Sequence, residues 1–249
     1  MVLQQRSRFV VPPVVDRGPI KGHLVVAGGA LGSSNADVYK KFIVLAGGSR
    51  TARVGIVPAA SSSLKSSEAF KRDLIGHGLA PENIEIIPLS THDFKGTTED
   101  ESAWAANRDS DAVASTIRNL DAVWFVGGDQ TRITSALFDP DRSESKALKA
   151  MWGIYCDGAV LGGTSAGAAI MSDVMLAGGG SLDTLSRGFT DTYDGLVQQE
   201  GVPAYLERGL GFFRYGIGRS GAEAGLRGDV LDPETGLLEQ HPCPLDALL

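Results

Sequence analysis

The chain contains only two cysteines among its 249 residues, and two thiols cannot build a disulfide framework or a structural zinc site. It also lacks any apolar run approaching ~18 residues, so we expect no membrane-spanning helix. The first 22 residues show no continuous apolar stretch ahead of a small-residue cleavage site, unlike a signal peptide. These absences favour a cytoplasmic protein with no metal, no cofactor and no membrane partner.

Positive charge is also scarce, with 23 Lys and Arg against 30 Asp and Glu and a formal net charge of -7. A general nucleic-acid binder needs a basic face, so nucleic acid is not expected as a partner. Glycine is abundant, but its 32 copies follow no Gly-X-Y period, which excludes collagen and indicates many tight turns. The length suits one large α/β domain or two small ones.

From residue 23 onward, short apolar segments alternate with segments of helical periodicity. The apolar segments predict strands at 23–27, 53–58, 84–89, 121–127 and 158–162. They are almost continuously apolar, which is typical of strands covered on both faces. Helices are expected over 36–46, 66–75 and 144–155, and from Asp109 or Ser110 to Arg118. This alternation predicts an α/β fold, in which a parallel sheet is sandwiched by helices.

The two ends of the chain differ from this pattern. Residues 1–22 carry three prolines, and we expect them to form an extended N-terminal arm ahead of an α/β domain over 23–213. The segment 214–249 holds six glycines and three prolines in 36 residues and keeps no amphipathic period. We therefore expect an atypical tail there, either loop-rich or abnormal.

The strongest chemical signal is the sequence Gly-Thr-Ser-Ala-Gly at 163–167. It follows a predicted strand and precedes an apolar helical stretch, which is the context of a G-x-S-x-G nucleophile elbow. Such a turn lifts the Ser165 hydroxyl clear of the sheet and directs the Ala166 amide at a developing oxyanion. The simpler interpretation is a small-residue turn that lets helix and strand approach closely.

A second signal is Gly-Gly-Asp-Gln at 127–130, directly after the predicted strand 121–127. Catalytic groups gather at the carboxyl ends of parallel strands, so this bend should share an edge with Ser165. Gly128 could then offer a second oxyanion amide, and Gln130 could hold a polar group of the substrate. The alternative is that Asp129 simply caps a helix.

The glycines of segment 27–32 suggest a dinucleotide loop but are one glycine short of G-x-G-x-x-G. No acidic residue follows the second strand to contact a ribose. We therefore expect a tight turn that lines the site, with a nucleotide-binding protein only as an outside alternative.

Three segments together resemble one peptidase family. They read VWFVGGDQTRIT at 123–134, GGTSAGAAIMSDVM at 162–175 and RGLGFF at 208–213. Over roughly residues 20–213 the chain is similar in order and spacing to the cyanophycinases, which share a serine peptidase family with the aspartyl dipeptidases. The resemblance implies a flavodoxin-like sandwich like that of class I glutamine amidotransferases, and a homodimer.

The resemblance also implies an activity and site residues. The substrate would be cyanophycin, an aspartate polymer with arginine on its side chains, and the product β-aspartyl-arginine. Ser165 would be the nucleophile, and Gly128 and Ala166 would supply oxyanion amides. Gln130 and Arg132 would contact the aspartyl part of the substrate.

The family's general base does not match. The family follows the GLG segment with Asp-Gln-His-Phe, whereas this chain has alanine near residue 222. After Ser165 the only histidine is His241, with Glu239 near enough in sequence to orient it. His77 lies at a predicted helix end, where a cation near the carbonyl end explains it. His92 follows the third predicted strand and could face the edge of the site, although a surface loop is the simpler interpretation. The loss of resemblance from about Arg214 predicts a frameshifted or truncated copy with weak or absent activity.

Two other functions remain open at this point. One is an aspartyl or isoaspartyl dipeptidase of the same fold, acting on β-aspartyl peptides. The other is a catalytically inactive homologue that binds the polymer without cutting it.

Overall fold

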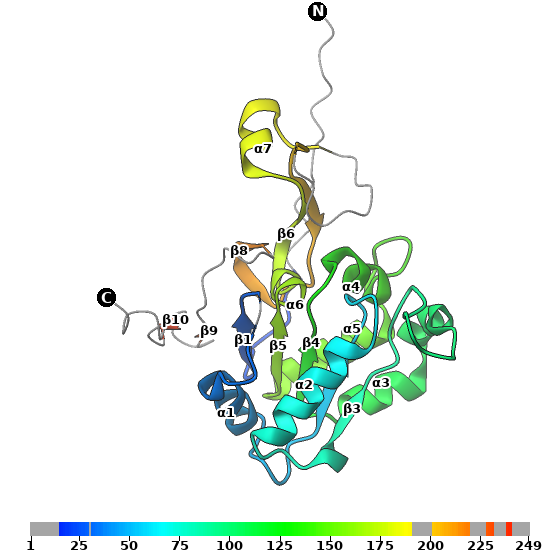
Figure 1. The fold of residues 1–249 in the computed structure, drawn as a ribbon, viewed down its shortest axis with the longest axis vertical. Helices are drawn as coiled ribbons and strands as arrows, with labels where there is room; N and C mark the ends of the chain where they lie inside the picture. The colour runs from blue at the N-terminus through cyan, green and yellow to red at the C-terminus, as the bar shows by residue number, and fades with distance from the viewer. Residues whose placement is uncertain (1–14, 30, 191–200, 220–227, 232–237, 241–249) are drawn as a thin grey trace, which may run out of the picture.

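The computed structural model describes residues 15–29, 31–190, 201–219, 228–231 and 238–240. Its main sheet has the strand order β10-β9-β1-β5-β4-β2-β3 (Figure 1). The parallel strands are β1 (His23–Ala27), β2 (Val54–Val57), β3 (Ile84–Ile86), β4 (Ala122–Phe125) and β5 (Val160–Thr164). Two antiparallel strands, β9 (Gly228–Leu231) and β10 (Leu238–Gln240), extend the sheet beyond β1. The predicted α/β fold with a parallel sheet is confirmed.

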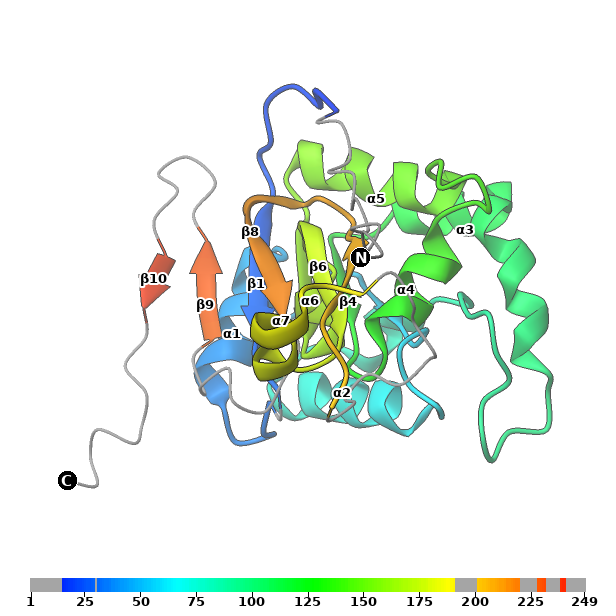
Figure 2. The same ribbon diagram turned by 90° about the horizontal axis from the view of Figure 1, so that it is seen from above.

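Helices cover both faces of this sheet (Figure 2). One face carries α1 (Ala36–Leu45) and α2 (Lys65–Gly76), and the other carries α3 (Asp111–Arg118) and α5 (Lys146–Asp157). The shorter elements are α4 (Gln130–Leu137), α6 (Ala166–Ala169) and two 3-10 helices, η1 (Pro81–Asn83) and η2 (Glu101–Asp109). Every residue of β2 and β4 is buried, as expected for strands covered on both faces.

Side-chain caps fix where several helices begin. The Ser110 hydroxyl accepts a hydrogen bond from the Val113 amide at the start of α3, and the Ser145 hydroxyl accepts one from the Leu148 amide in α5. Each such cap stabilises a helix by about 1 kcal/mol. The expected helix ending at Arg118 therefore starts after Ser110, the second of the two predicted caps.

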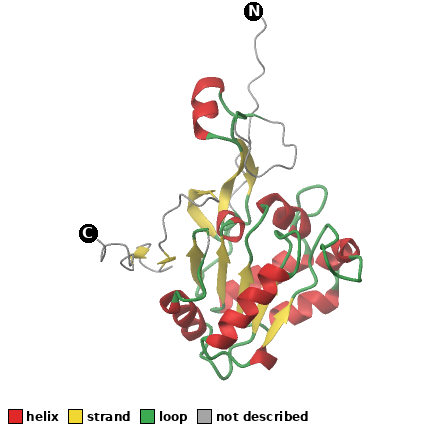
Figure 3. Ribbon diagram, in the orientation of Figure 1, coloured by secondary structure: helices red, strands yellow, loops and turns green. Residues whose placement is uncertain are grey.

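A second, three-stranded sheet stands beside the first and has the order β7-β6-β8. Its strands are β6 (Ser172–Gly178), β7 (Tyr205–Arg208) and β8 (Phe213–Arg219), and α7 (Ser181–Arg187) stands between β6 and β7, away from the main sheet (Figures 1 and 3). The sequence analysis did not predict this sheet, nor the strands that follow residue 213. The helical stretch expected after Ser165 is also shorter than it suggested, because α6 ends at Ala169.

Residues 15–22 of the expected N-terminal arm form neither helix nor strand and run along α5. The Gly22 amide donates to the Tyr155 carbonyl at 2.9 Å, and the Arg17 guanidinium lies 4.3 Å from the centre of the Trp152 ring. Within the described ranges, none of the helices combines the length and the apolar character needed to cross a bilayer.

Candidate active site

The two predicted bends meet at the carboxyl edge of the main sheet. Phe125 of β4 pairs with Gly163 of β5, so the segments that follow these strands emerge side by side. A methyl group placed on Gly127 would lie 3.2 Å from Ser165 Cβ and 3.9 Å from Ser165 Oγ. The prediction that the 127–130 bend and the 163–167 elbow share one edge is therefore confirmed.

Ser165 joins β5 to α6 in a strained backbone conformation, with φ 54° and ψ -110°. Non-glycine residues rarely adopt such angles, at a cost of about 1–3 kcal/mol. Hydrogen bonds hold the strain in place: its amide donates to the Ala27 carbonyl at 3.1 Å, and its carbonyl accepts from the Ala168 and Ala169 amides at 2.9 Å each. Its side chain is only half-buried. This is the geometry that a nucleophile elbow needs.

The two glycines of the G-x-S-x-G sequence are required by close backbone contacts. A methyl group on Gly163 would lie 2.4 Å from the carbonyl carbon and oxygen of Gly167, and one on Gly167 would lie 2.1 Å from the Phe125 carbonyl oxygen. Real contacts of that kind do not occur, so any larger residue would displace the elbow. Close packing by small residues was the simpler interpretation of 163–167. The structure shows that this packing and the elbow are features of one turn, so the two interpretations do not exclude each other.

Gly128 packs just as closely on the segment that follows β2. Its φ is 146°, and a methyl group on it would lie 2.1 Å from the Ala60 carbonyl oxygen. The next amide, that of Asp129, donates to the same oxygen at 2.9 Å. Sequence analysis missed this supporting segment, because nothing in the residues around Ala60 signals chemistry.

The two predicted oxyanion donors follow the neighbouring strands β4 and β5. Neither the Ala166 amide nor the Gly128 amide donates a hydrogen bond to another residue of the described ranges. Backbone amides held by a rigid turn can stabilise an oxyanion, each at about 3 kcal/mol. Their role in catalysis stays a prediction.

Asp129 and Gln130 have clear structural contacts. Asp129 caps α4, since its Oδ1 accepts from the Thr131 amide at 2.9 Å. Gln130 is 1% exposed, and its side-chain nitrogen donates to the Leu176 and Ala177 carbonyls of β6 at 2.8 and 2.9 Å. Gln130 thus ties α4 to the second sheet, and a contact with substrate stays a prediction.

Arg132 is more exposed and lies beside His92. Its Nε is 3.9 Å from the Asp129 carboxylate, and its Nη1 is 3.5 Å from His92 Nε2. His92 Nε2 donates to the Ser61 carbonyl at 2.7 Å. Burial lowers the pKa of His92, and the Arg132 charge lowers it further, against the opposing effects of the Ser61 carbonyl, Asp129 and Asp93. His92 is therefore half-buried beside Arg132, which pairs with Asp129 of the bend.

Both ring nitrogens of His92 already have partners. Nε2 donates to the Ser61 carbonyl at 2.7 Å, and Nδ1 lies 3.3 Å from the Ser90 hydroxyl. These contacts disfavour His92 as the base that takes the Ser165 proton.

The other two described histidines lie at the end of α2 and at the start of β1. His77 is the C-cap residue of α2, and its Nε2 donates to the Ser33 carbonyl at 2.8 Å, whereas His23 begins β1 at the opposite edge of the sheet. His241, the predicted base, lies outside the described residues. Of its predicted partner Glu239, the structure describes only the strand position in β10. The identity of the base stays a prediction.

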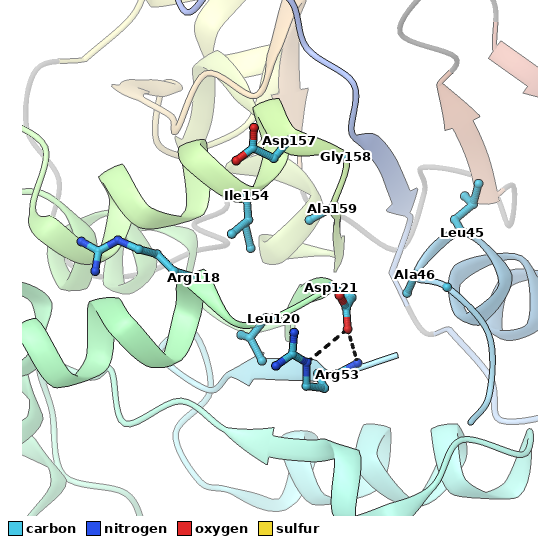
Figure 4. Close-up of a pocket in the computed structure, with 11 residues that line it drawn as sticks. Leu45, Ala46, Arg53, Arg118, Leu120, Asp121, Ile154, Asp157, Gly158 and Ala159 are labelled. Carbon is cyan, nitrogen blue, oxygen red and sulfur yellow. Dashed lines mark hydrogen bonds and ion pairs between the residues drawn. The ribbon is translucent and has the colours of Figure 1, made fainter. Parts of the chain in front are cut away.

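The segment after β1 adjoins the elbow, as the Ser165–Ala27 hydrogen bond shows. This agrees with the expectation of a turn that lines the site. A cavity of about 400 Å³ lies instead at the amino edge of the sheet, among residues that precede β2, β4 and β5 (Figure 4). There Arg53 pairs with Asp121 at 3.4 Å, and both side chains are largely exposed. The cavity is therefore separate from the Ser165 site.

Comparison with known proteins agrees with the resemblance found in the sequence. The chain is 28% identical over 194 residues to the cyanophycinase of Trichormus variabilis, a match covering 78% of this chain and 58% of the relative. It is 26% identical over 178 residues to that of Synechococcus elongatus, covering 71% and 49%. The chain thus spans about three fifths or less of the length of these curated relatives.

The chain was also compared with protein-family models and with solved structures. No family model matches it. Among solved structures, a peptidase from an acI-B1 Actinobacterium aligns with a TM-score of 0.46 at 18% identity, covering 64% of this chain and 60% of the other.

Proposed function

We propose that this chain, a homologue of the cyanophycinases, is a serine-type exopeptidase that releases β-aspartyl-arginine from cyanophycin. The observation that carries the proposal is the strained Ser165 elbow beside the Gly127–Gly128 bend. Backbone strain of this kind clusters at active sites, and presenting a nucleophile is the use that a G-x-S-x-G elbow makes of it. The likeness to cyanophycinases supports the choice of substrate. We propose that the protein acts as a cytoplasmic homodimer.

The proposed reaction is acyl transfer. Ser165 Oγ attacks the scissile carbonyl carbon while a base takes its proton, and the carbonyl π electrons move onto oxygen. The Ala166 and Gly128 amides hold this oxyanion. The intermediate collapses, the C–N bond breaks, and the amine leaves with a proton returned by the base. Water then hydrolyses the acyl-serine ester by the same steps.

The proposed rate depends on the base. Alanine occupies position 222, near which the family pattern expects its histidine. His241 with Glu239 is the candidate replacement within this sequence. Because the nucleophile and its base act as a unit, an unsuited base leaves only a small residual rate. We therefore propose weak hydrolysis by this chain.

The test is to incubate the full chain with cyanophycin and to quantify released β-aspartyl-arginine by mass spectrometry. We expect slow release that disappears in Ser165→Ala and persists in Ser115→Ala, a change at an exposed serine of α3. A turnover of the order of 10 per second would contradict the proposed weak activity.

Parallel incubation with aspartyl and isoaspartyl dipeptides separates the dipeptidase alternative. Faster cleavage of the dipeptides than of the polymer would overturn the choice of substrate. Polymer binding that survives Ser165→Ala, with no release by the parent chain, would instead indicate an inactive polymer-binding homologue.

A further inference from the structure

Helix α4 begins at the 127–130 bend and is tied to the second sheet by buried polar side chains. Thr134, which is 0% exposed, donates from its hydroxyl to Glu207 Oε1 of β7 at 2.8 Å. One helical turn earlier, Gln130 donates to two carbonyls of β6. The helix is thus held at two points on the face that turns away from solvent.

Glu207 is unusual for a strand residue because its ionisable carboxyl group is only 14% exposed. Burial raises its pKa, while Arg142, at 2.9 Å, and the Thr134 hydroxyl lower it. The nearby charge of Asp129 raises it as well, which places Glu207 within electrostatic reach of the bend. The proposed reaction makes no use of this carboxylate.

Residues in contact along the first turn of α4 link Glu207 to the bend. The Thr134 hydroxyl that donates to Glu207 also lies 3.0 Å from the Thr131 carbonyl. The Thr131 hydroxyl donates to Asp129 Oδ1 at 2.6 Å, and the Asp129 amide donates to the Ala60 carbonyl at 2.9 Å. The residue before Asp129 in the chain is Gly128.

We infer that Glu207 is a positioning residue that, through Thr134, holds α4 and with it the Gly128 amide at the correct distance from Ser165. The inference rests on the proposed function, because it assigns Glu207 a part in forming the oxyanion site. The bend is confined on one side by Ala60 and on another by Ser165. The link to Glu207 prevents α4 from withdrawing in the remaining direction.

Small displacements matter in such a site. An oxyanion donor acts only within about 2.7–3.1 Å of the developing charge. A shift of about 1 Å in a positioned group can reduce a rate by about 100-fold. Removing the Thr134–Glu207 hydrogen bond, one of the two links that hold α4, should move the Gly128 amide by a fraction of that shift of about 1 Å.

Three substitutions and a control distinguish a loss of the Thr134–Glu207 link from a general loss of stability. Thr134→Val removes the hydroxyl and keeps the shape of the side chain. Glu207→Gln keeps an oxygen that can accept from Thr134, whereas Glu207→Leu does not. Ser110→Ala is the matched control, since it removes the cap of α3 and leaves α4 untouched.

Two measurements are made on each full-length variant. The first is the rate at which a fluorophosphonate labels Ser165. The second is hydrogen exchange at the Asp129 amide, which requires no reactivity. In Thr134→Val and Glu207→Leu we expect labelling about tenfold slower and exchange about tenfold faster. Glu207→Gln and Ser110→Ala should stay within about twofold of the parent in both.

The outcomes distinguish this inference from the proposed function. If Thr134→Val labels and exchanges like the parent, Glu207 does not position the bend, and the proposed function stands. If Ser110→Ala slows labelling as much as Thr134→Val, the effect is general destabilisation and the inference is wrong. If the parent is not labelled, the proposed function is contradicted, and exchange alone decides whether Glu207 anchors the bend.

Discussion

Replacing Gly128 by alanine should damage both the stability and the reactivity of the site. A Cβ at this position would lie 2.1 Å from the Ala60 carbonyl oxygen and 2.5 Å from its carbon, and both are backbone atoms that cannot rotate away. Non-bonded carbon and oxygen atoms normally come no closer than about 3.3 Å. The bend must therefore move by about 1 Å, away from the segment after β2.

The cost has two parts. The backbone angle φ of 146° is unfavourable for alanine and costs about 1–3 kcal/mol, and relieving the clash adds to it. A free energy of unfolding lowered by about 2–4 kcal/mol follows. Moving the Gly128 amide by about 1 Å should slow fluorophosphonate labelling of Ser165 by about 100-fold.

The matched control is Gly153→Ala, because Gly153 is exposed in α5 with no atom within 4 Å of an added methyl group. This change should stabilise the protein by about 0.5–1 kcal/mol and leave labelling unchanged. Urea unfolding and labelling kinetics are measured for both variants. A Gly128→Ala protein with the stability and labelling rate of the parent would refute the account of the bend.

Three other predictions follow from the described geometry. Ser165→Gly should abolish labelling. It should also have a free energy of unfolding about 1 kcal/mol higher than that of Ser165→Ala, because glycine adopts a φ of 54° without the strain that alanine carries. Equal urea midpoints for the two variants would argue against strain. The raised pKa of Glu207 means that its stabilising contribution is present at low pH and is lost as pH rises through that pKa. Glu207→Gln should therefore gain stability relative to the parent as pH rises above 4.5, the ordinary pKa of a glutamate, in urea titrations, and a relative loss as pH rises would contradict the direction. Because the pKa of His92 is lowered, the parent should lose stability as pH falls below about 6.5, and His92→Asn should lose less. Identical acid unfolding curves for the two proteins would show that protonation of His92 does not contribute to this loss.

Much of the main sheet could be predicted from the sequence because its strands are buried on both faces. Segments such as 121–127 are apolar without alternation, and β4 lies inside that range at Ala122–Phe125. The link between Ser165 and the 127–130 bend was also accessible, since the carboxyl ends of parallel strands meet at one edge. The backbone angles of Ser165 themselves could be inferred only from the motif.

The second sheet carries no comparable signal. β7 reads Tyr-Leu-Glu-Arg, and β8 alternates glycine with larger residues, so neither resembles a buried apolar strand. A charged residue within a strand is normally interpreted as exposed. Glu207 is largely covered because Thr134 and Arg142 pair with it, and they lie 73 and 65 positions away in the chain. Such long-range partners cannot be identified from one sequence.

The most direct measurement of the central claim is the site of covalent labelling by a fluorophosphonate. The folded chain and its Ser165→Ala variant are treated alike, digested, and analysed by mass spectrometry. We predict one adduct, on the peptide that contains Ser165, which is absent from the variant and from chain unfolded in urea before treatment. A folded chain that gains no adduct at Ser165, or gains adducts equally at exposed serines such as Ser115, would contradict a nucleophile at this elbow.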